Sequence, residues 1–190
     1  MSLSLSHEGI PSSSKHPSHH RPHITGSLLT PKLVQSVADR YESGEASELH
    51  DKDGLQRWIA DLFHRLPYRI EWVEHDPYRS LETMRAEVNA SKTLQITTRN
   101  NESVFDPAVN LMFRAVHDAD HIAHTCDFDV GGELRAGRIM TARCGDPWGR
   151  ALIFSEIIAQ ACVAVAFGNF SRQKFVRFPR RFRKEILRRG

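Results

Sequence analysis

Hydrophobic residues recur along most of the chain with the three-to-four spacing of amphipathic helices. Residues 53–65 show this most clearly, because their apolar positions would all fall on one face of a helix. Upstream, Thr30 followed by Pro31 is typical of a helix start, with an N-cap side chain and a proline in the first turn. We therefore expect one helix from Pro31 and a second over 53–65.

Two short segments have the pattern of strands instead. Residues 69–74 alternate apolar and charged positions, and residues 93–98 are rich in β-branched side chains. Between them, residues 80–90 repeat apolar positions at the helical spacing. This order predicts a β-α-β unit.

Three further helices complete the expected fold. Asp106-Pro107 precedes a run to about Thr125 that is apolar on one side, and Asp146-Pro147 precedes residues 152–170, which are apolar nearly all round. A shorter helix is expected over 133–143. The predicted fold class is α+β, predominantly helical, with a small sheet of two to three strands and the most apolar helix at the centre of the core.

Composition divides the chain into three parts. Residues 1–30 contain eight Ser, five His and three Pro, too little apolar surface to order a fold, so we expect a disordered segment there. Residues 31–171 are expected to form a single globular domain. Residues 172–190 form the expected basic C-terminal tail, with nine Lys or Arg and one Glu; the net charge of +3 is thus +8 here and −5 elsewhere.

Neither a membrane nor a secretory route is expected. No run approaches the roughly 18 to 20 consecutive apolar residues that cross a bilayer, and the N-terminus lacks a basic start followed by an apolar block. The three cysteines, Cys126, Cys144 and Cys162, include no CxxC pair, which argues against a disulfide framework and a cysteine zinc site. We therefore expect a cytoplasmic protein.

Three histidines on one helical face are the strongest chemical signal. At about 100° per residue, His117, His121 and His124 fall within roughly 60° of one another. Histidines at i and i+4 can converge on one divalent metal, and the HDxxH segment is one methylene short of the HExxH motif of zinc peptidases. We expect His117 and His121 to bind a metal, with Zn²⁺ the expected ion. His124 is a pocket or surface residue, and the alternative for all three is a polar face turned to water.

Two carboxylates are candidates for the third ligand. Glu156 lies in the apolar helix, where a buried carboxylate needs either a cation or an arginine partner such as Arg114. Glu133 follows a Gly-Gly turn and has the alternative role of a helix-opening acid. We expect Glu156 as the ligand, with Glu133 and Asp118 as the catalytic groups that activate water, and Glu133 as the alternative ligand.

Three more polar residues are expected in the same pocket. Asn110 and Arg114 fall on or beside the histidine face, and Gln160 lies one turn after Glu156 on the same side. Other enzyme classes are not indicated, because the chain has no GxGxxG, no Walker loop and no GxSxG segment. The HD phosphohydrolase pattern lacks convincing partners for the His117-Asp118 pair.

Residues 76–170 resemble a domain of uncharacterised phage and prophage proteins. The resemblance is carried by the FRAVHD segment at 113–118, by His121, by Gly132-Glu133, and by Glu156 with Gln160 one turn later. In that domain the two histidines are one residue further apart, and a glycine precedes the second. The resemblance implies a phage-related origin and a single pocket that contains His117, Asp118, His121, Glu133, Glu156 and Gln160; it implies no particular activity.

Two functions from different classes follow. The first is a metal-dependent hydrolase acting on a small molecule, a peptide or a nucleotide. The second is a non-enzymatic, phage-related protein that binds nucleic acid or a host protein, with the His/Glu cluster as a structural polar network. Its basic tail interleaves phenylalanines with arginines, a pattern typical of nucleic-acid contact and equally of a surface whose phenylalanines pack on the body; the contacting residues would be Arg177, Arg180, Arg181 and Arg183.

Overall fold

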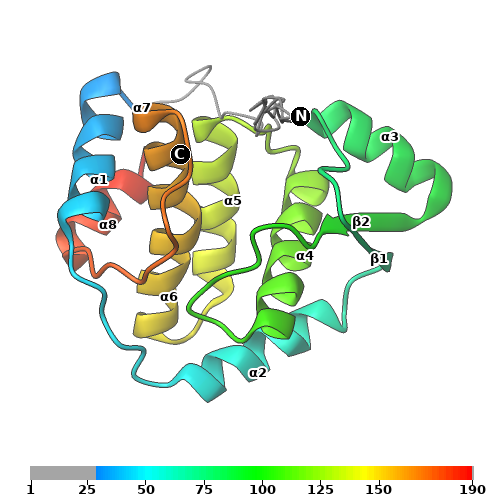
Figure 1. Cartoon of the computed structure of the whole chain (residues 1–190), viewed down its shortest axis with the longest axis horizontal. Helices are drawn as coiled ribbons and strands as arrows, with labels where there is room; N and C mark the ends of the chain where they lie inside the picture. The colour runs from blue at the N-terminus through cyan, green and yellow to red at the C-terminus, as the bar shows by residue number, and fades with distance from the viewer. Residues whose placement is uncertain (1–28, 190) are drawn as a thin grey trace, which may run out of the picture.

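The computed structural model describes residues 29–189, which form a group of packed helices with one small sheet at its side (Figure 1). This confirms the α+β class with helices predominating. All but the last two residues of the segment 1–30, for which disorder is expected, lie outside the described residues. In chain order the elements are α1 (Pro31–Ser43), α2 (Lys52–Phe63), β1 (Arg69–Val73), α3 (Leu81–Ser91), β2 (Thr93–Thr97), α4 (Pro107–His124), α5 (Val130–Arg143), α6 (Pro147–Ile153), the π-helical segment η1 (Phe154–Ala159), α7 (Gln160–Phe167) and α8 (Arg180–Leu187).

Helix starts follow the sequence signals, with one difference in the role of a side chain. Thr30 caps α1 by accepting a hydrogen bond from the backbone of Leu33. Asp106 precedes α4 as predicted, but its side chain does not cap the helix. Its carboxylate instead accepts hydrogen bonds from Lys52 at 2.7 Å and Gln56 at 3.1 Å. Asp106 therefore ties α4 to α2.

The predicted β-α-β unit is present. Strands β1 and β2 pair in parallel, with Arg69 opposite Thr93 and Val73 opposite Thr97, and α3 connects them. The buried side chains of β2 belong to the same apolar cluster as the sheet-facing alanines of α4. The sheet therefore packs on α4, the helix that carries the histidines (Figure 1).

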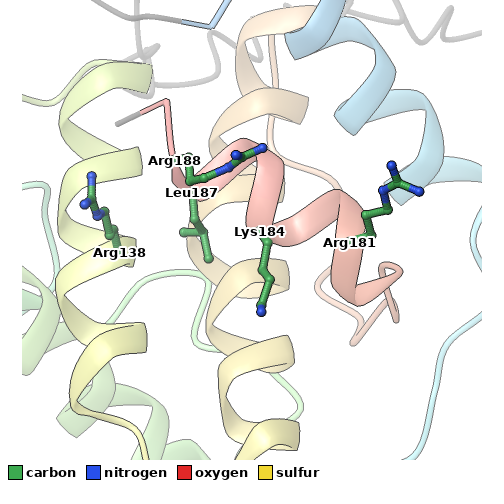
Figure 2. A pocket seen from close by; sticks show the side chains of 5 residues that line it. All are labelled: Arg138, Arg181, Lys184, Leu187 and Arg188. Atoms are coloured by element: carbon green, nitrogen blue, oxygen red, sulfur yellow. The ribbon is translucent and has the colours of Figure 1, made fainter.

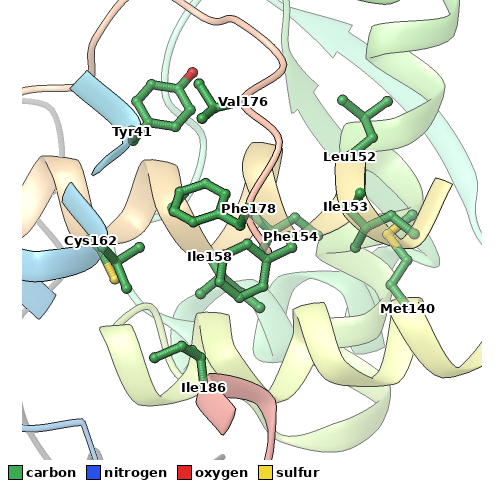
Figure 3. Close-up of a cluster of buried hydrophobic side chains, with 14 of the residues drawn as sticks. Tyr41, Met140, Leu152, Ile153, Phe154, Ile158, Cys162, Val176, Phe178 and Ile186 are labelled. Carbon is green, nitrogen blue, oxygen red and sulfur yellow. The ribbon is translucent and has the colours of Figure 1, made fainter. Parts of the chain in front are cut away.

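The apolar helix lies in the core, as predicted, but it is not regular throughout. Helices α6 and α7 are joined without a break by the π-helical turn η1, and the labelled residues of this run in Figure 3 are all buried: Leu152, Ile153, Phe154, Ile158 and Cys162. By length and composition alone, Pro147–Phe167 could cross a membrane. It was not expected as a membrane span, because polar residues such as Glu156 interrupt its apolar sequence. Of its most apolar window, 72% is buried inside the protein, as in the core helix of a soluble protein.

The basic C-terminal segment packs against the same core. Its apolar residues Phe175, Val176, Phe178 and Ile186 are buried. Phe178 packs edge-on against Phe154 with ring centroids 4.9 Å apart, and Figure 3 shows it beside Val176 and Ile186 among the core side chains. The expected boundary after residue 171 is therefore not a boundary of the core. Of the two arrangements considered for this segment, the packing of its phenylalanines on the body of the protein is the one found. Helix α8, which lies in this segment, was not predicted.

Candidate metal centre

The candidate centre lies where α4 meets the start of α5. His117 and His121 are one turn apart on α4, and Glu133 is in the first turn of α5. Asp129 caps α5 by accepting a 2.7 Å hydrogen bond from the backbone of Gly132. A Cβ at Gly132 would lie 1.8 Å from the carbonyl oxygen of Asp127. The glycine thus lets the chain turn tightly enough to bring Glu133 to the histidines.

Three potential ligand atoms converge in this centre. His117 Nε2 lies 3.0 Å from Glu133 Oε2 and 3.1 Å from His121 Nε2, and the remaining separation, between His121 Nε2 and Glu133 Oε2, is 3.6 Å. Metal–ligand bonds of about 2.0–2.2 Å place neighbouring ligand atoms roughly 3.0–3.6 Å apart in octahedral or tetrahedral coordination. His117, His121 and Glu133 could therefore hold a metal ion.

The ring of His121 is held in the tautomer that a metal requires. Its Nδ1 atom lies 2.7 Å from the carbonyl oxygen of Cys126 and donates a hydrogen bond to it. In the neutral ring this leaves the lone pair on Nε2, which faces the cluster. Metal-ligating histidines are commonly oriented by such a bond from the other ring nitrogen.

Electrostatics couple the three side chains strongly. Burial by itself would lower the pKa of His121, but the negative charge and hydrogen bond of Glu133 raise it to about 9. Burial opposes the ionisation of Glu133, yet the two imidazoles hold the pKa of its carboxyl well below the usual range. The cluster therefore favours a positive charge between its members, which a proton or a metal ion can supply.

A cavity of about 230 Å³ adjoins the cluster. Glu156 is on its wall, in the π-helical turn, with only 8% of the residue exposed. Burial raises the pKa of Glu156 to about 8, and the charge of Arg114 opposes this rise. The residues that line the cavity are Asn110, Phe113, Arg114, His117, Glu133, Glu156, Ile157, Gln160, Ala161, Phe170 and Gln173.

Of the two carboxylates considered for the third ligand, Glu133 lies with the histidine pair. Within residues 29–189, the group of converging ligand atoms contains Glu133 and not Glu156. Glu156 lies on the wall of the same cavity instead. The group that could hold a metal thus contains Glu133, which was expected as the alternative ligand, and does not contain Glu156, which was expected as the ligand. Asp118 is half-buried beside the cluster, where burial raises the pKa of its carboxyl.

Three of the other four predicted pocket residues line the cavity, and the fourth does not. Asn110, Arg114 and Gln160 line the cavity as expected, whereas His124 is exposed on the same helix. Arg114 donates to the carbonyl oxygens of Thr97, Arg99 and Asn100, so it fastens the loop after β2 to α4. Sequence patterns missed five lining residues, which are Phe113, Ile157, Ala161, Phe170 and Gln173. Phe170 was expected within the apolar helix, but α7 ends at Phe167, so Phe170 and Gln173 lie in the segment after it, where no periodicity marks a residue as facing a pocket.

The predicted nucleic-acid residues lie on a separate surface, which we call the basic face. Arg180, Arg181 and Arg183 come from α8, and Arg177 precedes it, with its guanidinium 4.1 Å from the centre of the Trp148 ring. Figure 2 shows α8 beside α5, with Lys184 and Leu187 on α8, Arg188 directly after it, and Arg138 on α5 around one hollow. Two adjoining hollows bring in Arg150 and Arg177, and no acidic residue lines any of the three in the described part of the chain.

Comparisons with known proteins add no assignment. No model of a protein family matches this chain, and neither a curated protein nor a solved structure matches it. The resemblance to the phage domain therefore stays a prediction.

Proposed function

We propose that this protein is a metal-dependent hydrolase whose ion is held by His117, His121 and Glu133. The observation that carries the proposal is the convergence of two imidazole nitrogens and one carboxylate oxygen at the edge of a cavity. Two histidines and one glutamate are a ligand set of catalytic zinc sites, which keep a further position open for water or substrate. Zn²⁺ is the expected ion, although the same set also suits Fe²⁺.

Glu156 is the proposed proton-transfer residue. A bound divalent ion would supply Lewis acidity, which polarises the substrate and acidifies water. Glu156 is on the wall of the cavity that adjoins the cluster, and burial brings its pKa to about 8. A carboxyl that titrates near neutral pH can accept a proton from water and later donate it to a leaving group.

Elemental analysis of the full chain and four variants tests the metal site. His117→Ala, His121→Ala and Glu133→Gln should each lose about one equivalent of metal relative to the parent. His124→Ala is the matched control, since it removes an exposed imidazole from the same helix. The histidine-rich N-terminal segment is common to all these proteins, so the differences report only the centre. Equal metal content in the parent and the three ligand variants would reject the proposal.

Hydrolysis is tested with the metal-loaded protein and chromogenic probes of three bond types. p-Nitrophenyl acetate, amino-acid p-nitroanilides and bis(p-nitrophenyl) phosphate report on ester, amide and phosphodiester cleavage. Turnover of at least one probe that disappears on chelation and in Glu156→Gln, while the variant still binds metal, supports the assignment. A bound metal without turnover of any probe would contradict a hydrolase and leave a structural metal site.

A second candidate function is nucleic-acid binding by the basic face. Three adjoining hollows lined by arginine and lysine without an acidic residue favour phosphate groups. Burial lowers the pKa of Arg183, and the positive charges of Arg177, Arg180 and Arg150 add to this effect. Such an accumulation of like charge is relieved by bound anions. This function does not require the metal centre.

A further inference from the structure

Buried polar atoms without partners gather around the cavity beside the metal centre. Within the described residues, five buried side-chain atoms make no hydrogen bond, and four of them belong to the cavity-lining residues His117, Glu156, Gln160 and Gln173. Buried polar atoms are almost always hydrogen-bonded in native proteins. Their concentration at one cavity points to a ligand that supplies the missing partners.

The Gln160 amide lies against the hydroxyl of Tyr41, to which its Nε2 atom donates a hydrogen bond at 2.7 Å. The same hydroxyl donates to the carbonyl oxygen of Lys174 at 3.0 Å and accepts from the Lys174 backbone N–H at 2.9 Å. In this arrangement Gln160 Oε1 is a buried acceptor without a hydrogen-bond donor, and only 3% of the residue is exposed.

Glu156 supplies a second unpartnered acceptor in the same cavity. Its Oε1 atom makes no hydrogen bond, and the residue is 8% exposed. Because Glu156 and Gln160 lie four residues apart in the continuous helical run formed by η1 and α7, both side chains present oxygen to one wall. Burial keeps the Glu156 carboxyl protonated below its pKa of about 8, so one of its oxygens can donate and the other accept, whereas Gln160 Oε1 can only accept. Both Oε1 atoms are closed to solvent, so a ligand reaches them when the side chains turn toward the cavity. The wall thus offers two acceptor oxygens to a ligand that brings N–H groups.

We propose that this cavity binds an uncharged –NH₂ donor, of which a primary carboxamide is the simplest case, with its two N–H groups directed at Gln160 Oε1 and Glu156 Oε1. That this group belongs to a substrate rests on the proposed hydrolase function. The binding itself does not, because both acceptors are outside the metal ligand set. The substrate class is therefore a carboxamide-bearing compound rather than a phosphate ester or a carboxylate.

Hydrogen bonding disfavours an anion and charge disfavours a cation. A phosphate or carboxylate would bring further oxygen acceptors against Gln160 Oε1, which has no proton to donate. The guanidinium of Arg114 would attract an anion, but it already donates to the backbone oxygens of Thr97, Arg99 and Asn100. A cationic amine would face the guanidinium of Arg114 and the ion proposed at His117 and Glu133. Phe113 and the half-exposed Phe170 line the same cavity, and their rings can contact a planar amide or an attached ring.

Four ligands of nearly the same shape separate these possibilities. Benzamide is a neutral donor, acetophenone is neutral without an N–H, benzoate is an anionic acceptor and benzamidinium is a cationic donor. Their dissociation constants are measured by NMR titration of the full chain in the presence of a chelator, so that no ligand binds through a metal. We expect benzamide to bind about tenfold more tightly than acetophenone and benzoate, and more tightly than benzamidinium.

Two variants assign the binding to the proposed acceptors. Gln160→Met and Glu156→Met should each weaken benzamide binding about fivefold, the usual effect of one hydrogen bond, and leave acetophenone binding unchanged. A damaged fold would weaken both ligands equally. Gln35→Met, on the exposed side of α1 where the amide bonds only to Asp39, is the matched control and should bind like the parent.

The other outcomes separate the carboxamide site from the hydrolase function. Tighter binding of benzoate or benzamidinium would show an anion or cation site, and absence of binding by all four ligands would show that water alone satisfies the acceptors. Selective benzamide binding in a protein that holds no metal would leave the carboxamide site standing and reject the hydrolase. Metal binding and turnover without benzamide selectivity would support the hydrolase and reject the carboxamide site.

Discussion

The Nε2 atoms of His117 and His121 lie 3.1 Å apart, one helical turn from each other, with a carboxylate oxygen of Glu133 3.0 Å from the first of them. Two ring nitrogens this close cannot both present lone pairs to each other without a proton or a cation between them. The helix fixes the spacing of the two rings, while α5 fixes the carboxylate. The arrangement therefore behaves as one electrostatic unit.

Stability without metal should fall as the pH rises from about 6.5 to about 9. The pKa of His121 is raised from 6.5 to about 9 in the folded protein, so its protonated form stabilises the fold fully below 6.5 and this contribution is lost through 9. The loss should be on the order of 2–3 kcal/mol, counted once because Glu133 is the partner. Urea unfolding with chelator at several pH values measures it. Glu133→Gln should flatten the profile over this range, and His124→Ala should not.

Glu156→Gln should abolish turnover while preserving metal content. The amide keeps the volume of the side chain but cannot accept a proton, so a rate loss of about 100-fold or more is expected. In the parent, activity should rise with pH through about 8, because a base must be ionised to act and burial sets its pKa there. A rate that is flat from pH 6 to 9 would assign proton transfer to another group, with Asp118 the next candidate.

Gly132→Ala should weaken both the fold and the metal centre. The added Cβ would lie 1.8 Å from the backbone oxygen of Asp127, so the start of α5 would have to shift and carry Glu133 away from the histidines. We expect a loss of about 2–4 kcal/mol in the free energy of unfolding and a lower metal affinity. Gly145→Ala is the control, because nothing lies within 4 Å of a Cβ there; it should change stability by less than about 0.5 kcal/mol. Equal stability of the two variants would contradict the close approach.

Charge reversal on the basic face should reduce nucleic-acid affinity. Arg180→Glu with Lys184→Glu changes the formal charge by −4 on residues that line the adjoining hollows. Fluorescence anisotropy with a single-stranded oligonucleotide should show weaker binding, and the dependence of log Kd on log salt should become shallower. Reversal of Lys32 on α1 and Arg57 on α2 is the control with the same charge change at other exposed sites. Equal losses in both proteins would mean that net charge alone drives the binding.

The sequence determined most of the secondary structure by itself. Apolar periodicity placed the helices before the basic C-terminal segment, and it did not predict α8. Pro31, Pro107 and Pro147 marked three helix starts, because a proline in the first turn lacks an N–H that the helix does not use. The same local geometry put His117 and His121 on one face of α4, since the i, i+4 spacing is a property of every α-helix. These features depend on a few neighbouring residues, so they could be read without the fold.

Only the tertiary structure decided which carboxylate meets the histidines. Glu133 and Glu156 are both compatible with the sequence, and the choice depends on how α5 packs against α4, which Gly132 permits through its contact with Asp127. It likewise decided that the basic C-terminal segment packs on the core, because Phe175 and Phe178 find partners in elements far away in the chain. Contacts between distant segments depend on packing and on the long-range field of charges, which local patterns do not encode.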